Sequence, residues 1–198
     1  MSGGQVWVIL GPSGVGKGTV CAELRRRCRE PFYSISATTR APRVGEVDGV
    51  NYHFVSQDWF TKAIAAGELL EYACVHGRDY YGTPKGPVEA ALAKGRHVVL
   101  EIDIQGARQV KRIMPSAQLV FLAPPSWREL EHRLRNRGTE DEDAIRTRLK
   151  TAEAEMAAAD VADHIVINSS VGQTVAALVS LLGLTTTQPE DEASEHSA

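Results

Sequence analysis

QVWVILGPSGVGKGT, residues 5–19, is the stretch that most constrains the fold. Five of the six residues 6–11 are apolar and three of those are β-branched, which predicts a buried strand. Gly11–Lys17 then fits the G-x-x-x-x-G-K pattern of a phosphate-binding loop, and we expect a helix to begin near Lys17. The glycines let backbone N–H groups converge on phosphate oxygens, while the lysine and the helix dipole favour the same anion. The stretch therefore predicts a nucleotide triphosphate site.

The loop departs from the usual pattern at position 18. The residue after the lysine is normally Ser or Thr, whose hydroxyl binds Mg²⁺, but this chain has Gly18 followed by Thr19. We expect Thr19 or Asp103 to reach Mg²⁺ instead, directly or through water. The alternative interpretation is a glycine-rich turn without a ligand, which the order of strand, loop, lysine and helix disfavours. The expected contacts to the triphosphate are Gly11, Pro12, Ser13, Gly14, Val15, Gly16, Lys17, Gly18 and Thr19.

The composition is that of one folded domain rather than of a nucleic-acid-binding or membrane protein. The chain has 198 residues, 43% hydrophobic, with a formal net charge of −3, and this charge disfavours nucleic acid or an anionic membrane as the main partner. The three cysteines, Cys21, Cys28 and Cys74, have neither disulfide-framework nor metal-site spacing. With no signal-peptide pattern and no apolar run of about 18 residues, we expect a soluble cytoplasmic protein. The sequence does not indicate its oligomeric state.

Strands and helices alternate over most of the chain, which predicts an α/β fold with a parallel sheet of about five strands. The expected strands cover residues 6–11, 32–36, 98–102, 119–122 and 165–167, and the expected helices 17–30, 87–93, 107–113, two pieces within 127–159, and 171–182. Ser126 is the expected N-cap of the first helix after Pro124 and Pro125. Residues 36–84 break the alternation and predict an inserted lobe of short antiparallel strands around a helix at 57–66. Residues 185–198 are polar and acidic, which predicts a disordered tail.

Four further motifs, in this order along the chain, resemble those of guanylate kinases. They are SATTRAPRVGEVDGVNYHF at 36–54, LLEYACVHGRDYYGT at 69–83, VLEIDIQGA at 99–107 and HRLRNRG at 132–138. The resemblance extends from the phosphate loop to about Asn168. It implies a P-loop nucleoside monophosphate kinase with a three-layer fold. Such an enzyme transfers the γ-phosphoryl group of Mg²⁺-bound ATP to GMP, a step of purine nucleotide metabolism. The resemblance further implies a domain at 1–184, with its core at 1–35, 85–126 and 160–184, a GMP-binding lobe at 36–84 and a helical lid at 127–159.

The resemblance also implies which residues bind GMP. The matching positions are Ser36, Arg40, Arg43, Tyr52, Glu71, Tyr81, Thr83, Glu101 and Asp103. The two arginines and two tyrosines would hold the phosphate, and Ser36, Thr83 and Glu71 the base. Guanine presents two adjacent donors that a carboxylate can accept, whereas adenine has an acceptor at N1 and no 2-amino group. Taken without the resemblance, ordinary alternatives stay open: a surface loop with two arginines, core tyrosines, an exposed strand residue at Glu71 and an ion pair at Glu101.

The donor side and the mechanism follow from the same resemblance. Arg133, Arg137 and Arg148 match lid positions that contact ATP phosphates or bound nucleotide, and a solvated, salt-bridged helix surface is the alternative. Asn168 matches a position near the adenine or its ribose. The expected catalytic groups are Lys17, Arg40, Arg43 and the three lid arginines, which align the substrates and neutralise charge without a general base.

Two other functions compete with this hypothesis. One is another nucleoside monophosphate kinase, because the sequence GKGT also occurs in adenylate kinase-like loops. The other is a non-catalytic guanylate kinase-like binding module, which the intact loop Gly11–Lys17 disfavours. A GTPase is less consistent still, because the chain has no N-K-x-D motif.

Overall fold

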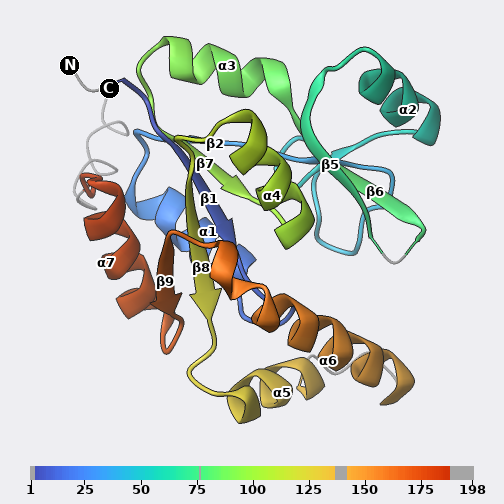
Figure 1. Ribbon diagram of the computed structural model, residues 1–198, viewed down its shortest axis with the longest axis vertical. Helices are drawn as coiled ribbons and strands as arrows, with labels where there is room; N and C mark the ends of the chain where they lie inside the picture. The colour runs from blue at the N-terminus through green and yellow to red at the C-terminus, as the bar shows by residue number, and fades with distance from the viewer. Residues whose placement is uncertain (1–2, 76, 137–141, 188–198) are drawn as a thin grey trace, which may run out of the picture.

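The computed structural model describes residues 3–75, 77–136 and 142–187 (Figure 1). Its centre is a five-stranded sheet with the strand order β2-β7-β1-β8-β9, in which every pair of neighbours is parallel. The strands are β1 (Val6–Leu10), β2 (Phe32–Tyr33), β7 (Val98–Glu101), β8 (Gln118–Ala123) and β9 (His164–Ile167). The predicted α/β fold with a parallel sheet of five strands is therefore confirmed.

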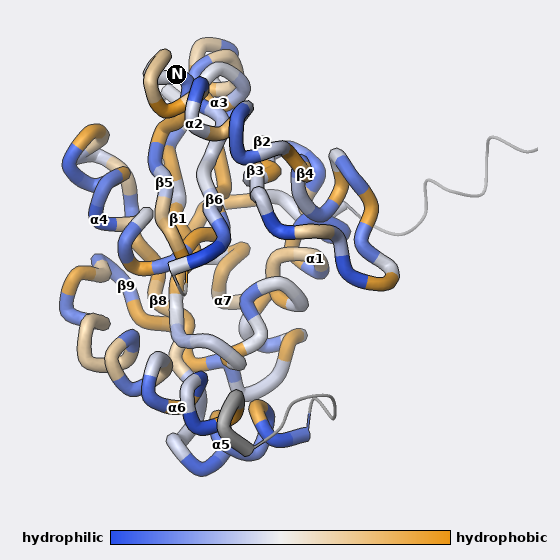
Figure 2. The backbone as a smooth tube through the Cα atoms, turned by 90° about the vertical axis from the view of Figure 1, so that its right-hand side faces the viewer, coloured by the Kyte–Doolittle hydropathy of each residue, from blue (hydrophilic) through white to orange (hydrophobic). Residues whose placement is uncertain are grey.

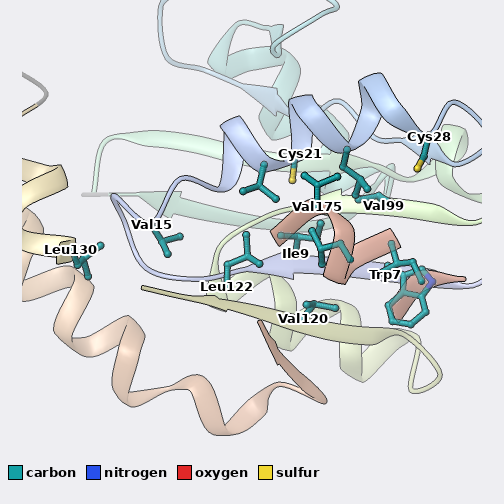
Figure 3. Packing of buried hydrophobic residues seen from close by; sticks show 14 of the residues in the cluster. Trp7, Ile9, Val15, Cys21, Cys28, Val99, Val120, Leu122, Leu130 and Val175 are labelled. Carbon is teal, nitrogen blue, oxygen red and sulfur yellow. The ribbon is translucent and has the colours of Figure 1, made fainter. Parts of the chain in front are cut away.

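Helices cover both faces of this sheet, so its central strand is buried throughout. One face carries α1 (Lys17–Arg27) and α7 (Val171–Leu182), and the other carries α3 (Lys85–Ala93) and α4 (Ile104–Ile113). Successive β1 side chains point to opposite faces, as a pleated strand requires; Trp7 and Ile9 join the first layer and Val8 the second. Figure 3 shows Ile9 beside Val175 of α7, on the same side of the sheet as Cys21 of α1, and Figure 2 shows hydrophobic residues concentrated along β1.

A second sheet with the order β4-β3-β6-β5 accounts for the inserted segment. It contains β3 (Ala37–Thr38), β4 (His53–Phe54), β5 (Leu69–Val75) and β6 (Asp79–Pro84), with α2 (Gln57–Ala65) between β4 and β5. The predicted antiparallel pairing holds for β5 with β6 and for β3 with β6. It is wrong for β3 and β4, which pair in parallel. The reason is the long connection 39–52, since parallel neighbours need a crossover of about a dozen residues or more.

Helix ends follow local capping. Ser126 caps α5 (Trp127–Arg135) as predicted, accepting from the Glu129 backbone N–H at 3.2 Å. Helix α4 begins earlier than predicted, because the Asp103 carboxylate accepts from the Gly106 N–H at 2.8 Å and starts the helix at Ile104. The remaining elements are α6 (Glu142–Ala157) and the short 3₁₀ helix η1 (Ala159–Val161). Of the helices in the described ranges, none has the length and hydrophobicity needed to span a bilayer.

Candidate functional site

The phosphate loop connects β1 to α1 at the carboxyl edge of the central sheet. Gly16 caps α1 with φ 97°, a left-handed conformation that favours glycine. A side chain at Gly11 would collide with the backbone carbonyl of Leu122 in the neighbouring strand. The first turn of α1 contains no acidic residue, so no carboxylate in that turn competes with an anion at the positive end of the helix dipole. The backbone therefore has the conformation expected of a phosphate-binding loop.

Side chains of the loop and of α6 hydrogen-bond to the loop. The Lys17 ammonium donates to the carbonyls of Gly11 at 2.6 Å and Pro12 at 3.3 Å. The Ser13 backbone N–H donates to the Glu155 carboxylate of α6 at 2.8 Å, and Arg148 of the same helix donates to the Ser13 hydroxyl at 3.2 Å. A carboxylate from α6 thus lies on a loop N–H of the kind that binds phosphate oxygens.

Asn168 and Arg133 both donate hydrogen bonds to the loop, at the carbonyl of Val15. The Asn168 amide donates to the Val15 carbonyl at 2.7 Å and accepts from the Thr174 hydroxyl at 2.9 Å. Arg133 donates to the carbonyls of Val15 at 3.2 Å and Asn168 at 3.1 Å. Both residues thus have structural partners that the sequence did not reveal, and their contacts with nucleotide stay predictions. Arg137 lies outside the described residues.

Two cavities adjoin the loop. The first, of about 310 Å³, lies between the loop, the second sheet and α6; its lining includes Ser13, Lys17, Ser36, Tyr52, Glu71, Tyr81, Glu101, Asp103, Arg148 and Glu155. The second, of about 430 Å³, lies between the loop, α5 and the start of α7; its lining includes Gly14, Val15, Gly16, Thr19, His132, Arg133, Asn168 and Ser170. Many of the predicted site residues therefore line one or other of two cavities that share the loop. Gly18 lines a third cavity with Ser36, Tyr52 and Glu101, and Arg40, Arg43 and Thr83 line neither of the first two. Thr19 and Asp103, the two predicted metal contacts, line different ones.

Glu71 is the most unusual side chain of the first cavity. It is 3% exposed, and the fully buried Thr83, its partner in the β5–β6 register, donates its hydroxyl to the Glu71 carboxylate at 2.6 Å. Burial raises the pKa of this carboxyl group to about 7, and the negative charge of Asp103 acts in the same direction. The alternative of an exposed strand residue is wrong, and the geometry is that of a fixed acceptor facing a cavity.

Arg40 lies against Tyr52 and Tyr81, two residues that line the first cavity. Its guanidinium donates to the Tyr81 hydroxyl at 3.0 Å and to both Glu46 carboxylate oxygens at 3.0 and 2.9 Å. It also lies 5.5 Å from the centroid of the Tyr52 ring. Arg43 is exposed, and its backbone N–H donates to Glu46 at 2.7 Å. The structure therefore gathers Arg40, Tyr52 and Tyr81, whereas the Arg43 side chain points to solvent.

Two carboxylates lie at the carboxyl end of β7, where α/β sheets place ligands. Glu101, the last residue of β7, is exposed and lines the first cavity. The surrounding protein raises its pKa by displacing water, and the positive charge of Lys17 and a hydrogen bond from the Cys21 thiol oppose that rise. Asp103 caps α4 and also lines the first cavity. Lys17 and these two carboxylates therefore meet at one edge of the sheet.

Comparisons with known proteins identify the relatives of this chain. A family model described as "Guanylate kinase" matches residues 3–184. The chain is 54% identical to a guanylate kinase of Leifsonia xyli subsp. xyli over 175 residues, 88% of this chain and 69% of the relative. It is 49% identical to a guanylate kinase of Corynebacterium jeikeium over 183 residues, 92% of this chain and 97% of the relative. The crystal structure of guanylate kinase from Anaplasma phagocytophilum aligns with a TM-score of 0.77 at 31% identity, covering 92% of this chain and 86% of that one.

Proposed function

Because the chain belongs to the guanylate kinase family, we propose that its first cavity holds GMP and that its phosphate loop holds the triphosphate of ATP. The activity of the family is the transfer of the γ-phosphoryl group of ATP to GMP, which yields ADP and GDP. The proposal concerns the division of labour between the two cavities and the role of each residue in them.

The buried pair of Glu71 and Thr83 is the observation that carries the acceptor assignment. One oxygen of the carboxylate accepts from Thr83, which fixes its orientation in the cavity wall. An ionised carboxylate can accept from guanine N1–H and the 2-amino group together, whereas AMP would leave it without those donors. An unpaired acceptor in a buried site costs far more binding energy than a missing apolar contact. Ser36 lines the same cavity, and we assign it a contact with the base as well.

Arg40 is the proposed anchor of the GMP phosphate. A guanidinium binds phosphate by parallel, charge-assisted hydrogen bonds, and Glu46 and Tyr81 hold this one in a fixed orientation. Tyr52 and Tyr81 add hydroxyl groups, and Arg43 adds a second cation when the lobe 36–84 closes on the substrate. The acceptor oxygen is already an ionised phosphate oxygen, so the chain needs no general base.

On the donor side, Lys17 and the loop N–H groups bind the β- and γ-phosphates, and Arg148 and Arg133 of the lid 127–159 neutralise developing charge. Arg137 is proposed for the same role from its sequence position alone. Closure of lid and lobe excludes water, which would otherwise hydrolyse ATP. Glu155 must release the Ser13 N–H when a phosphate oxygen takes its place.

Magnesium is part of this proposal and would arrive with ATP. Mg²⁺ is usually held by one or two carboxylates, substrate phosphates and water rather than by an all-protein cage. Within residues 3–75, 77–136 and 142–187, no cluster of three or more His, Cys, Asp or Glu is arranged for a metal ion, which fits such a shared site. Asp103 offers a carboxylate in the first cavity and Thr19 a hydroxyl in the second. When bound, the ion would shield the phosphate charges.

The raised pKa of Glu71 gives a pH test of the acceptor assignment. GMP needs the ionised carboxylate, so its binding weakens as the pH falls through about 7 and the free enzyme takes up a proton. For a single group of this pKa, we expect the KM for GMP to rise about tenfold from pH 8 to pH 6. Steady-state kinetics at saturating ATP measure this directly.

Glu71→Gln is the matched variant, because it keeps the shape of the side chain without the titrating group. Its KM for GMP should be higher at pH 8 and change less with pH, apart from the ionisation of the GMP phosphate itself, whose second pKa is about 6. The ratio of the two enzymes' KM values removes the substrate ionisation. A ratio close to one at every pH would exclude Glu71 from GMP binding, and a ratio that is high but independent of pH would contradict its titration near pH 7.

A further inference from the structure

Gly106 lies in a helix, and its backbone conformation does not require glycine. It is the third residue of α4, it is buried, and it is not among the described glycines with positive φ. A glycine in the interior of a helix makes that helix less stable than an alanine would. Space, rather than backbone conformation, is therefore the physical reason for glycine at this position.

The space beside Gly106 is occupied by the Glu71 carboxylate. A Cβ atom at position 106 would collide with Glu71 Oε2 and would lie 2.9 Å from Glu71 Cδ and 3.3 Å from Ile102 Cδ1. The helix cannot simply move away, because Gln109 is tied to the Tyr72 backbone by two hydrogen bonds, donating to its carbonyl at 2.7 Å and accepting from its N–H at 3.3 Å. The free end of the Glu71 side chain is thus the part that would have to shift.

We propose that Gly106 is a positioning residue for guanine recognition, because its bare helical turn leaves room for the Glu71 carboxylate in the orientation that accepts from GMP. This inference rests on the proposed acceptor role of Glu71. Thr83 fixes one carboxylate oxygen from β6, and the helical turn at Gly106 bounds the other. A methyl group at 106 would push that second oxygen into the volume that the base is to occupy. The backbone, the phosphate contacts at Arg40 and the phosphate loop would keep their places.

Gly106→Ala tests the proposal. We expect the KM for GMP to rise about tenfold or more, comparable to the loss of one charge-assisted hydrogen bond, with the KM for ATP changed less than twofold. The higher helix propensity of alanine offsets part of the cost of the new contact, so the variant should stay folded at the assay temperature, which its thermal unfolding curve checks. Because the displaced carboxylate meets more water, the KM for GMP should also vary less between pH 6 and 8 than in the parent enzyme. Gly86→Ala is the matched control: Gly86 lies in the first turn of α3 with no atom within 4 Å of an added Cβ, and its kinetics should not change.

A double-mutant cycle with Glu71→Ala separates positioning from general disturbance. Once the Glu71 side chain is removed, the closest remaining neighbour of the added methyl group is Ile102 Cδ1 at 3.3 Å, which is not a proposed contact of GMP, so Gly106→Ala should cause no further loss of GMP affinity. An equal rise of KM in both backgrounds would overturn the proposal, as would an unchanged KM for GMP in Gly106→Ala alone. Normal GMP kinetics in Glu71→Ala would instead overturn the acceptor assignment itself.

Discussion

Replacing Lys17 with methionine is expected to lower kcat by about a thousandfold or more, the range seen when a preorganised cation is removed from a phosphoryl-transfer site. The Lys17 ammonium already lies on the loop, bonded to the carbonyls of Gly11 and Pro12, so it needs little rearrangement to meet the β- and γ-phosphates. Methionine keeps the length and the apolar stem but removes the charge. Coupled ADP release at saturating GMP and ATP measures the loss.

The control for this prediction is Lys62→Met on α2. Lys62 forms an exposed pair with Asp58 at 2.8 Å, far along the chain from the loop, and its loss should leave kcat unchanged. GMP binding, measured by isothermal titration in the absence of ATP, should survive in Lys17→Met within a few-fold. Lys17 lines the first cavity, but the proposed contacts to the base and phosphate of GMP, Glu71 and Arg40, are unchanged. A kcat that stays near that of the parent enzyme would mean that the loop does not carry the donor.

Arg40→Met is expected to raise the KM for GMP by about 10- to 100-fold, the equivalent of losing charge-assisted hydrogen bonds worth roughly 1.5–3 kcal/mol. The lost contacts are those to the phosphate of GMP and not to its base. The variant should therefore still have a higher kcat/KM for GMP than for AMP. The KM for ATP should change far less. Steady-state kinetics with each nucleotide varied in turn separate these effects.

Arg26→Met is the matched control for Arg40. Arg26 also forms a two-pronged pair with a glutamate, Glu23, with bonds of 2.8 Å, but its side chain is 66% exposed on α1. Exposed pairs of this kind contribute little to stability, so neither GMP kinetics nor the unfolding midpoint should move appreciably. If the two variants raised the KM for GMP equally, the assignment of the phosphate anchor would be wrong.

The sequence predicted the core of the fold well, because its cues are local. An apolar run, a glycine-rich loop and a helix follow one another within residues 5–27, and the structure reproduces β1, the loop and α1. Pairing between strands that are distant in the sequence was harder to predict. The two-residue strands β3 and β4 have too few residues for a side-chain pattern to reveal their direction of pairing. For Asp103 the sequence favoured a site role, although an Asp that directly follows a strand is also a preferred N-cap residue, and here it caps α4.

The site was predictable only in part for a similar reason. Glu71 follows Leu70, and strict alternation would send one of them to solvent, yet both are buried. The register shift between Leu69 and Glu71 explains this, because a bulge turns consecutive side chains to the same side. The contacts of Ser13 with Glu155, 142 residues away, and of Val15 with Asn168, 153 residues away, have no local signature at all. Only the order of the motifs pointed to the acceptor.

A single comparison of acceptors tests the central claim most directly. Coupled ADP release with Mg²⁺ and ATP, measured with GMP, AMP, CMP and UMP under identical conditions, gives kcat/KM for each acceptor. A site built to hydrogen-bond guanine should favour GMP by about a thousandfold or more over AMP, as buried polar sites do against analogues that lack their donors. Equal or greater kcat/KM with AMP would contradict the account.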